Sequence, residues 1–147
     1  LAASGRGADF DLGVKIVHTP ENDRCEDATP ILTSAPIAGD TTWAHDDSAY
    51  PLGQSCTGYL LGGHDVFYAV DLLAGQTITI RVAPAPDYDV AVYVRPACDA
   101  DAACLAGRDA ALKGGEEVLP FTAPEDGTYY IVVDGAVGGG AFEISVE

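Results

Sequence analysis

The sequence predicts an all-β protein built as an antiparallel β-sandwich of eight or nine strands. Short segments of alternating or continuous apolar residues recur along the 147 residues, and clusters of Gly, Pro and Asp separate them. No segment carries the 3.6-residue apolar period of an amphipathic helix, so helices are not expected. Many short strands joined by frequent turns are typical of two packed antiparallel sheets.

Nine segments are predicted to be strands. The clearest follows the turn residues Asp126 and Gly127, because residues 128–133 are all β-branched or aromatic. Both faces of this strand carry apolar side chains, which indicates a central position in its sheet. Residues 76–83 instead alternate apolar with polar side chains, which predicts a half-exposed strand. The other predicted strands are residues 9–17, 28–33, 40–44, 65–72, 89–95, 117–123 and 140–147.

Charge restricts the ligands that such a protein could bind. The chain has 23 Asp and Glu residues against 7 Lys and Arg residues, a formal net charge of -16. This charge repels phosphate backbones and therefore excludes nucleic acid as a partner. No apolar run approaches the roughly 18 residues of a bilayer-spanning helix, so no membrane span is expected.

The four cysteines predict two disulfides. Cys25, Cys56, Cys98 and Cys104 form no CxxC pair, which argues against a zinc ribbon or a thioredoxin-like centre. Three connectivities are possible. The pairing of Cys25 with Cys56 and of Cys98 with Cys104 is favoured, because the second pair brackets the turn-like sequence CDADAAC. Disulfides indicate an oxidising compartment, so the protein is expected to be secreted, extracellular or at the cell surface.

Motifs of catalysis are missing from the sequence. GQSCTG at 53–58 is not a nucleophile elbow, because Thr57 stands where the final glycine is needed. The three histidines, His18, His45 and His64, have neither the HExxH motif nor a paired spacing, and are expected to be surface or turn residues. DADAA at 99–103 lacks the glycine of an EF-hand loop. We therefore predict that the protein is not an enzyme.

Several stretches in order resemble a known family. ENDRCEDATPI, GDTTWAHDD, GHDVFYAVDLLAGQTITI, DYDVAVYV and APEDGTYYIVVDG together resemble the bacterial pre-peptidase C-terminal domain, to which clostridial collagen-binding domains are related. The resemblance covers residues 21–147. It implies a jelly-roll-like sandwich without catalytic activity that is usually appended to secreted peptidases and other exported proteins.

The resemblance also implies a calcium site. Some members of the group bind calcium where an Asn-Asp pair meets an Asp-rich loop. Asn22 and Asp23 match the pair here, and Asp40 with Asp46 or Asp47 stands where loop ligands would be. Calcium prefers oxygen donors of this kind, although Asn and Asp side chains also close turns on their own backbone. Calcium is the one cofactor expected.

Residues 1–20 form a leader before the compact body. Phe10, Leu12, Val14 and Ile16 alternate with a second row of mostly polar residues, which predicts a strand at 9–17. This strand could pair within its own sandwich. It could also add to the open edge of a neighbouring copy, and a head-to-tail contact of that kind makes a fibre unless it closes a ring.

Two classes of function follow from these observations. In the first, the chain is an extracellular structural subunit that assembles with other copies of itself through its N-terminal strand. In the alternative, it is an accessory binding domain that holds a secreted peptidase or other hydrolase on an extracellular polymer. Trp43 and several tyrosines could provide a surface for such a polymer, although buried aromatics are commoner in a sandwich.

Overall fold

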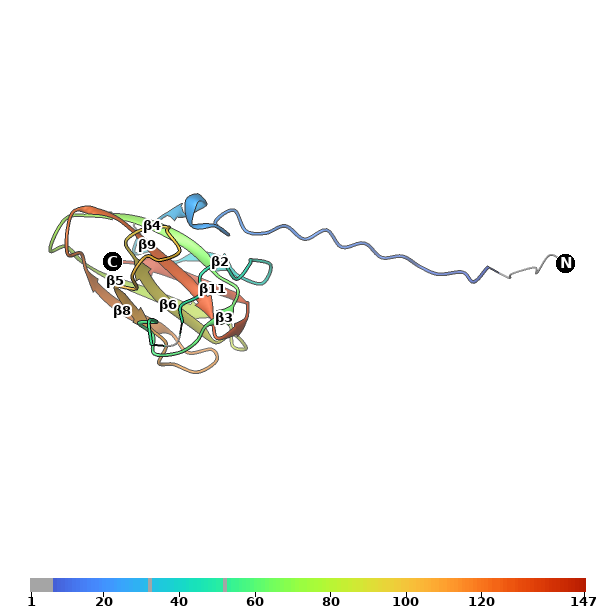
Figure 1. The fold of residues 1–147 in the computed structure, drawn as a ribbon. Coiled ribbons are helices and arrows are strands. Elements are labelled where there is room, and N and C mark those ends of the chain that lie inside the picture. Colours follow the sequence, from blue (N-terminus) through green and yellow to red (C-terminus); the bar gives the residue numbers. More distant parts are fainter. Residues whose placement is uncertain (1–6, 32, 52) are drawn as a thin grey trace.

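The computed structural model describes residues 7–31, 33–51 and 53–147, so residues 1–6 of the predicted leader lie outside the described part. Figure 1 shows a β-sandwich from which an extended N-terminal segment projects. The predicted fold class is therefore confirmed. Among the described residues, no helix is long and apolar enough to cross a membrane.

Two sheets form the sandwich. The first has the strand order β1-β4-β9-β6-β7 and the second the order β2-β11-β5-β8, while β10 and β3 form a separate two-stranded ladder. The elements in chain order are the 3₁₀ turn η1 (Cys25–Asp27), β1 (Thr29–Pro30), β2 (Ile37–Asp40), β3 (Gly62–Gly63), β4 (Val66–Leu72), β5 (Thr77–Pro84), β6 (Val90–Arg95), β7 (Ala106–Arg108), β8 (Glu117–Thr122), β9 (Gly127–Gly135), β10 (Val137–Gly138) and β11 (Ala141–Val146).

The main core lies between the two sheets. Every second residue of the long strands points into it, for example Ile78, Ile80 and Val82 of β5, which are almost completely buried. Thr77 of the same strand lies on the exposed outer face, as the alternation predicted. Each fully buried aliphatic side chain of this kind stabilises the fold by about 1.5 to 3 kcal/mol relative to an exposed one.

Strand β9 is covered on both faces. It lies between β4 and β6, and its residues Ile131 and Val133 point into the main core. Val132 points the other way, into a second apolar cluster that contains Phe67 and Tyr93. The central position predicted for this strand is confirmed.

One predicted strand is displaced along the chain. Residues 40–44 were expected to be extended, but the strand in this region is β2 at Ile37–Asp40, and a turn follows it. The Asp40 carboxylate accepts a hydrogen bond from the Thr42 amide at 2.7 Å, which closes the turn. Residue 39 of β2 is a glycine, and a β-carbon at this position would lie 2.6 Å from the Tyr68 hydroxyl oxygen. This close approach leaves no room for a side chain.

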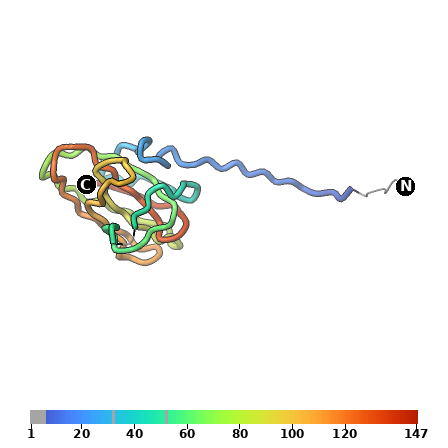
Figure 2. Tube along the Cα trace, viewed as in Figure 1, coloured from blue at the N-terminus to red at the C-terminus, as the bar shows by residue number. Residues whose placement is uncertain are grey.

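The predicted strand at 9–17 does not pair within its own sandwich. Residues 7–20 form no strand, and the segment runs away from the body (Figure 2). The four apolar side chains of its predicted face are more than three-quarters exposed: Phe10, Leu12, Val14 and Ile16. The intramolecular alternative is therefore wrong.

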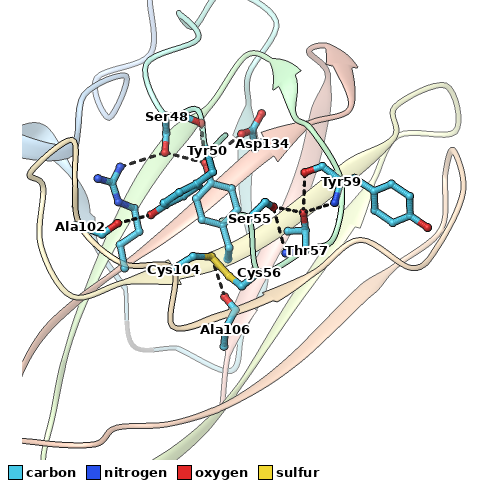
Figure 3. Close-up of a disulfide and its surroundings, with 12 residues drawn as sticks. Ser48, Tyr50, Ser55, Cys56, Thr57, Tyr59, Ala102, Cys104, Ala106 and Asp134 are labelled. Atoms are coloured by element: carbon cyan, nitrogen blue, oxygen red, sulfur yellow. Dashed lines mark hydrogen bonds between the residues drawn. A yellow bond between two sulfur atoms is a disulfide. The ribbon is translucent and has the colours of Figure 1, made fainter. Parts of the chain in front are cut away.

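All four cysteines form disulfides, but the predicted pairing is wrong. Cys25 is bonded to Cys98 and Cys56 to Cys104, with Cα atoms 5.4 and 5.6 Å apart. The prediction favoured short loops. In the structure, both Cys98 and Cys104 lie in the loop between β6 and β7, and each holds a different distant segment against the outer face of the first sheet. Figure 3 shows the second bond in its surroundings.

The pairing can be tested by cleavage before aspartate. This cleavage separates the four cysteines into the peptides 23–26, 47–64, 89–98 and 101–108. Under non-reducing conditions we expect the first to be linked to the third and the second to the fourth. The bonds span 73 and 48 residues, so each should stabilise the fold by roughly 4 kcal/mol. A linkage between peptides 23–26 and 47–64 would contradict the structure.

Candidate functional site

The candidate site lies where the chain enters the sandwich. Asn22 is buried against the start of β4, where its side-chain amide donates a hydrogen bond to the Phe67 carbonyl at 3.0 Å. The Phe67 amide in turn donates to the Asn22 carbonyl at 2.9 Å. These two bonds fix the position of Asp23, the next residue.

Asp23 is held against His45. One oxygen of its buried carboxylate accepts the His45 backbone amide at 2.7 Å, and the other lies 2.6 Å from the imidazole Nδ1. The hydrogen bond to Asp23 raises the pKa of His45 above its ordinary value, and the negative charge of Asp23 adds to the effect. His45 itself is exposed, so its ring presents its remaining nitrogen to solvent.

Asp47 completes a group of three possible metal ligands. One ligand atom from each of Asp23, His45 and Asp47 lies within 4.8 Å of the others. Asp40 and Asp46 are not part of this group. Of the predicted carboxylate ligands, the described structure thus brings together Asp23 and Asp47, and it adds a histidine that the sequence analysis treated as a surface residue. The neighbouring letters HDD at 45–47 were the signal that could have found it.

A buried carboxylate holds the loop that carries this group. Asp65 lies immediately before β4 and is fully buried. One of its oxygens accepts the backbone amides of Asp47 and Ser48 at 2.9 and 3.0 Å, and its own amide donates to the His45 carbonyl. Its other oxygen has no hydrogen-bond partner among the described residues.

A polar network extends from this loop across the first sheet. The Tyr93 hydroxyl lies 2.7 Å from the Ser48 hydroxyl and 3.1 Å from the Asp134 carboxylate, and Arg95 donates to Ser48 at 3.1 Å. Figure 3 shows Ser48 and Asp134 on either side of this cluster. Asp65 precedes Val66, which pairs with Val133, so Asp65 and Asp134 are neighbours across β4 and β9.

Burial makes the carboxyls of Asp65 and Asp134 weaker acids than an ordinary aspartate. It raises the pKa of Asp65 to about 7 and that of Asp134 to about 9, and the charges of nearby carboxylates contribute to both shifts. A carboxyl without solvent or a cationic partner favours its neutral form. At neutral pH Asp134 therefore holds its proton and Asp65, which binds the loop at 45–48, is partly protonated.

A groove of about 430 Å³ opens beside this site, between the edge strands β1 and β2. Its wall includes Trp43, half of whose surface is exposed. The Lys15 ammonium lies 5.4 Å from the centre of the Trp43 ring, within the range of a cation–π contact. The other residues along the groove include Glu21, Asp40 and Tyr68.

The other histidines and the aromatic side chains considered in the sequence analysis lie outside the group of three possible metal ligands. The His64 ring nitrogen Nδ1 lies 3.1 and 3.0 Å from the carbonyls of Thr41 and Thr42, where it donates to the turn after β2. His18 lines the groove. Of the aromatic side chains considered for a polymer surface, Tyr68, Tyr88 and Tyr93 are buried, Tyr50 is half-buried, and Trp43 and Tyr59 are exposed.

We expect the melting temperature to fall between about pH 5 and pH 9, because Asp65 and Asp134 hold protons in the folded state that the unfolded chain releases. Their contribution is complete below the ordinary aspartate pKa of 3.8 and is lost as the pH rises through about 7 and about 9. Asp134→Asn should reduce this fall. Glu143→Gln, on the exposed outer face of the second sheet, is the control and should keep it, because the Glu143 charge contributes to neither shift. Equal pH profiles of wild type and Asp134→Asn would contradict the assignment.

Comparisons with known proteins agree with this fold. Residues 66–135 match the family model of the bacterial pre-peptidase C-terminal domain. The domain of that name from a Bacillus anthracis collagenase is 20% identical, with a TM-score of 0.53 over 89% of this chain and 100% of that one. No curated protein sequence matches the chain significantly.

Two further solved structures share the sandwich. A periplasmic inhibitor of g-type lysozyme from Aeromonas hydrophila is 17% identical, with a TM-score of 0.50. The surface-associated copper-binding protein CorA of Methylomicrobium album BG8 is 16% identical, with a TM-score of 0.51. Each match covers 82% of this chain and 96% of the other. At these identities the likeness concerns the fold alone. The family match over residues 66–135 confirms the predicted resemblance to the bacterial pre-peptidase C-terminal domain.

Proposed function

We propose that the chain is a non-catalytic accessory module of an exported protein, and that it holds its host on an extracellular polymer. The observation that carries this proposal is the family match over residues 66–135, because such domains are appended to secreted peptidases and other exported proteins. Two disulfides that span distant segments fit an oxidising location outside the cytoplasm.

The groove between β1 and β2 is the best candidate for the polymer-binding surface. It combines an exposed indole, Trp43, with the carboxylates of Glu21 and Asp40. An aromatic side chain that is half exposed provides a flat apolar face for a sugar ring or a proline-rich chain. The carboxylates provide acceptors for hydroxyl or amide groups along the same chain.

Replacement of Trp43 by alanine tests this surface. We expect the wild-type chain to co-sediment with an insoluble polymer from a panel of fibrillar collagen, chitin and cellulose, and Trp43→Ala to weaken that binding by about tenfold or more. Tyr59→Ala is the matched control, because Tyr59 is an exposed aromatic that does not line the groove. Equal binding by wild type and Trp43→Ala would place the surface elsewhere, and no binding to any polymer would contradict the proposed function.

Calcium at the candidate site is a further part of the proposal. The described residues fit calcium in part, because Asp23 and Asp47 supply carboxylate oxygens while His45 already engages both oxygens of Asp23. Asn22 precedes Asp23 in the chain, and its side-chain amide nitrogen is bound to the Phe67 carbonyl. Calcium bound there would join the N-terminal entry of the chain to the loop at 45–48.

A calcium titration of the melting temperature tests this site. Mass action should stabilise the fold by about 2.7 kcal/mol at a free calcium concentration about 100 times Kd, and a chelator should reverse the change. Asp47→Asn should remove the response and Asp46→Asn should keep it. A rise with zinc but not with calcium would contradict the calcium assignment, as would an unchanged calcium response in Asp47→Asn.

Self-assembly into fibres through Phe10, Leu12, Val14 and Ile16 stays a prediction from the sequence. The names of the collagenase domain, the lysozyme inhibitor and CorA mention no fibre subunit. Assembly requires particles much larger than a monomer in sedimentation velocity, and their loss when residues 1–17 are removed. A monomer at high concentration would contradict it.

A further inference from the structure

The exposed N-terminal segment resembles the last strand of the sandwich. Residues 7–15, GADFDLGVK, align without a gap to residues 139–147, GGAFEISVE. Gly7, Phe10 and Val14 are identical to their counterparts Gly139, Phe142 and Val146. Leu12 and Asp11 correspond to the chemically similar Ile144 and Glu143.

The residues that the two segments share are those that the packing of β11 in the second sheet requires. β11 lies between β2 and β5 in the second sheet, and Phe142, Ile144 and Val146 point into the main core with exposures of 4%, 0% and 2%. Glu143 lies on the outer face and is exposed. The alternation of Phe10, Leu12 and Val14 with Asp9 and Asp11 reproduces this division between core and solvent.

The shared glycine gives a second, independent reason. At Gly139 a β-carbon would lie 2.5 Å from the Thr41 carbonyl oxygen, so the close approach of the turn after β2 excludes a side chain there. Gly7 has nothing within 4 Å in this structure. The packing of this sandwich therefore does not require a glycine at position 7. In the alignment, however, Gly7 corresponds to Gly139, where the packing does require one.

In this chain the segment has no core to cover. Phe10, Leu12 and Val14 are 82%, 78% and 77% exposed, and the segment extends away from the body (Figure 1). Its own sandwich has no vacant place for it, because β11 already fills the position between β2 and β5. An apolar strand of this composition is stable in water only when a sheet covers it.

We propose that residues 7–17 are the closing strand of a second sandwich of the same kind, in which they take the place that β11 has here. The partner is a sandwich in the same polypeptide whose own last strand these residues provide, so the two sandwiches stand in tandem. An intact second copy does not fit, because its β11 place is filled. This inference does not rest on the proposed function.

The tandem arrangement explains the short connection. Only residues 18–20 separate the segment from the turn at Asp23, whose amide bonds to the Pro20 carbonyl. The partner sandwich would then stand directly beside the groove that His18 and Pro20 line, with Lys15 near Trp43. Ala8 conflicts with the packing around β11, because a β-carbon at the corresponding Gly140 would lie 2.6 Å from the Tyr88 ring. The partner should therefore have a smaller or displaced side chain where this sandwich has Tyr88.

A fusion of two copies tests the proposal. Residues 19–140 are joined to residues 9–147, so that residues 9–15 take the place of residues 141–147 in the first copy and Gly140 stays beside Tyr88. The reference fusion keeps residues 141–147 and continues with residues 16–147, and it differs only within these seven positions. We expect two folded sandwiches with four disulfides in both fusions, and slow amide exchange at Phe10, Leu12 and Val14 in the first. In the single chain these amides should exchange without protection.

Two variants of the test fusion separate core from solvent positions. Phe10→Asp with Leu12→Asp and Val14→Asp should unfold the first sandwich and leave the second intact. Asp9→Ser with Asp11→Ser should change nothing, because the corresponding residues of β11 are exposed. A first sandwich that folds in the reference fusion but not in the test fusion would overturn the proposal.

A graft into the single chain gives a test that does not depend on the fusions. Ala141→Asp, Glu143→Asp, Ile144→Leu and Ser145→Gly give β11 the residues of segment 9–14. The proposal requires a folded monomer with both disulfides, and failure to fold would overturn it. Sedimentation of the native chain distinguishes the two sources of a partner. A monomer supports the tandem arrangement, and association that Leu12→Asp abolishes would assign the segment to a second copy and overturn it.

Discussion

The two apolar faces of strand β9 impose the main constraint on this structure. A strand at the surface of a sandwich needs one apolar face, but β9 lies between β4 and β6 and buries both Ile131 and Val132 completely. The first of these is covered by the opposite sheet. The second requires an additional layer. The 3₁₀ turn η1 and the loops that precede β4 and follow β6 form this layer.

The disulfides follow from the same constraint. Loops without regular structure have few backbone hydrogen bonds of their own and lose much entropy when they are fixed over a sheet. Cys25 and Cys56 lie in the two segments that cover the outer face, and both are bonded to the loop after β6. The crosslinks therefore hold the layer that protects Val132, and they connect segments that are far apart in sequence.

The candidate site lies in this layer. Asp23 and His45 meet because the entry of the chain and the loop after β2 are both held against β4, the first by Asn22 and the second by Asp65. Two acidic side chains under the loop, Asp65 and Asp134, are fully buried in a protein whose formal net charge is -16. Such groups are costly to bury in their charged form, so their pKa values rise to about 7 for Asp65 and about 9 for Asp134. The layer that the disulfides hold thus also carries the candidate site.

The sequence by itself determined the class of fold, the two-faced central strand and most long strands, because alternation of apolar and polar residues is a local property with a period of two. Residues 76–83 and 128–133 could be placed in this way. Local patterns do not say which strands become neighbours. The pairing of Cys25 with Cys98 and the meeting of Asp23 with His45 depend on contacts between distant parts of the chain, because burial and hydrogen bonding across the sheets bring those residues together. The detached position of segment 9–17 follows from the sheet as a whole, because β11 already fills the place between β2 and β5. Only the tertiary structure decided these features.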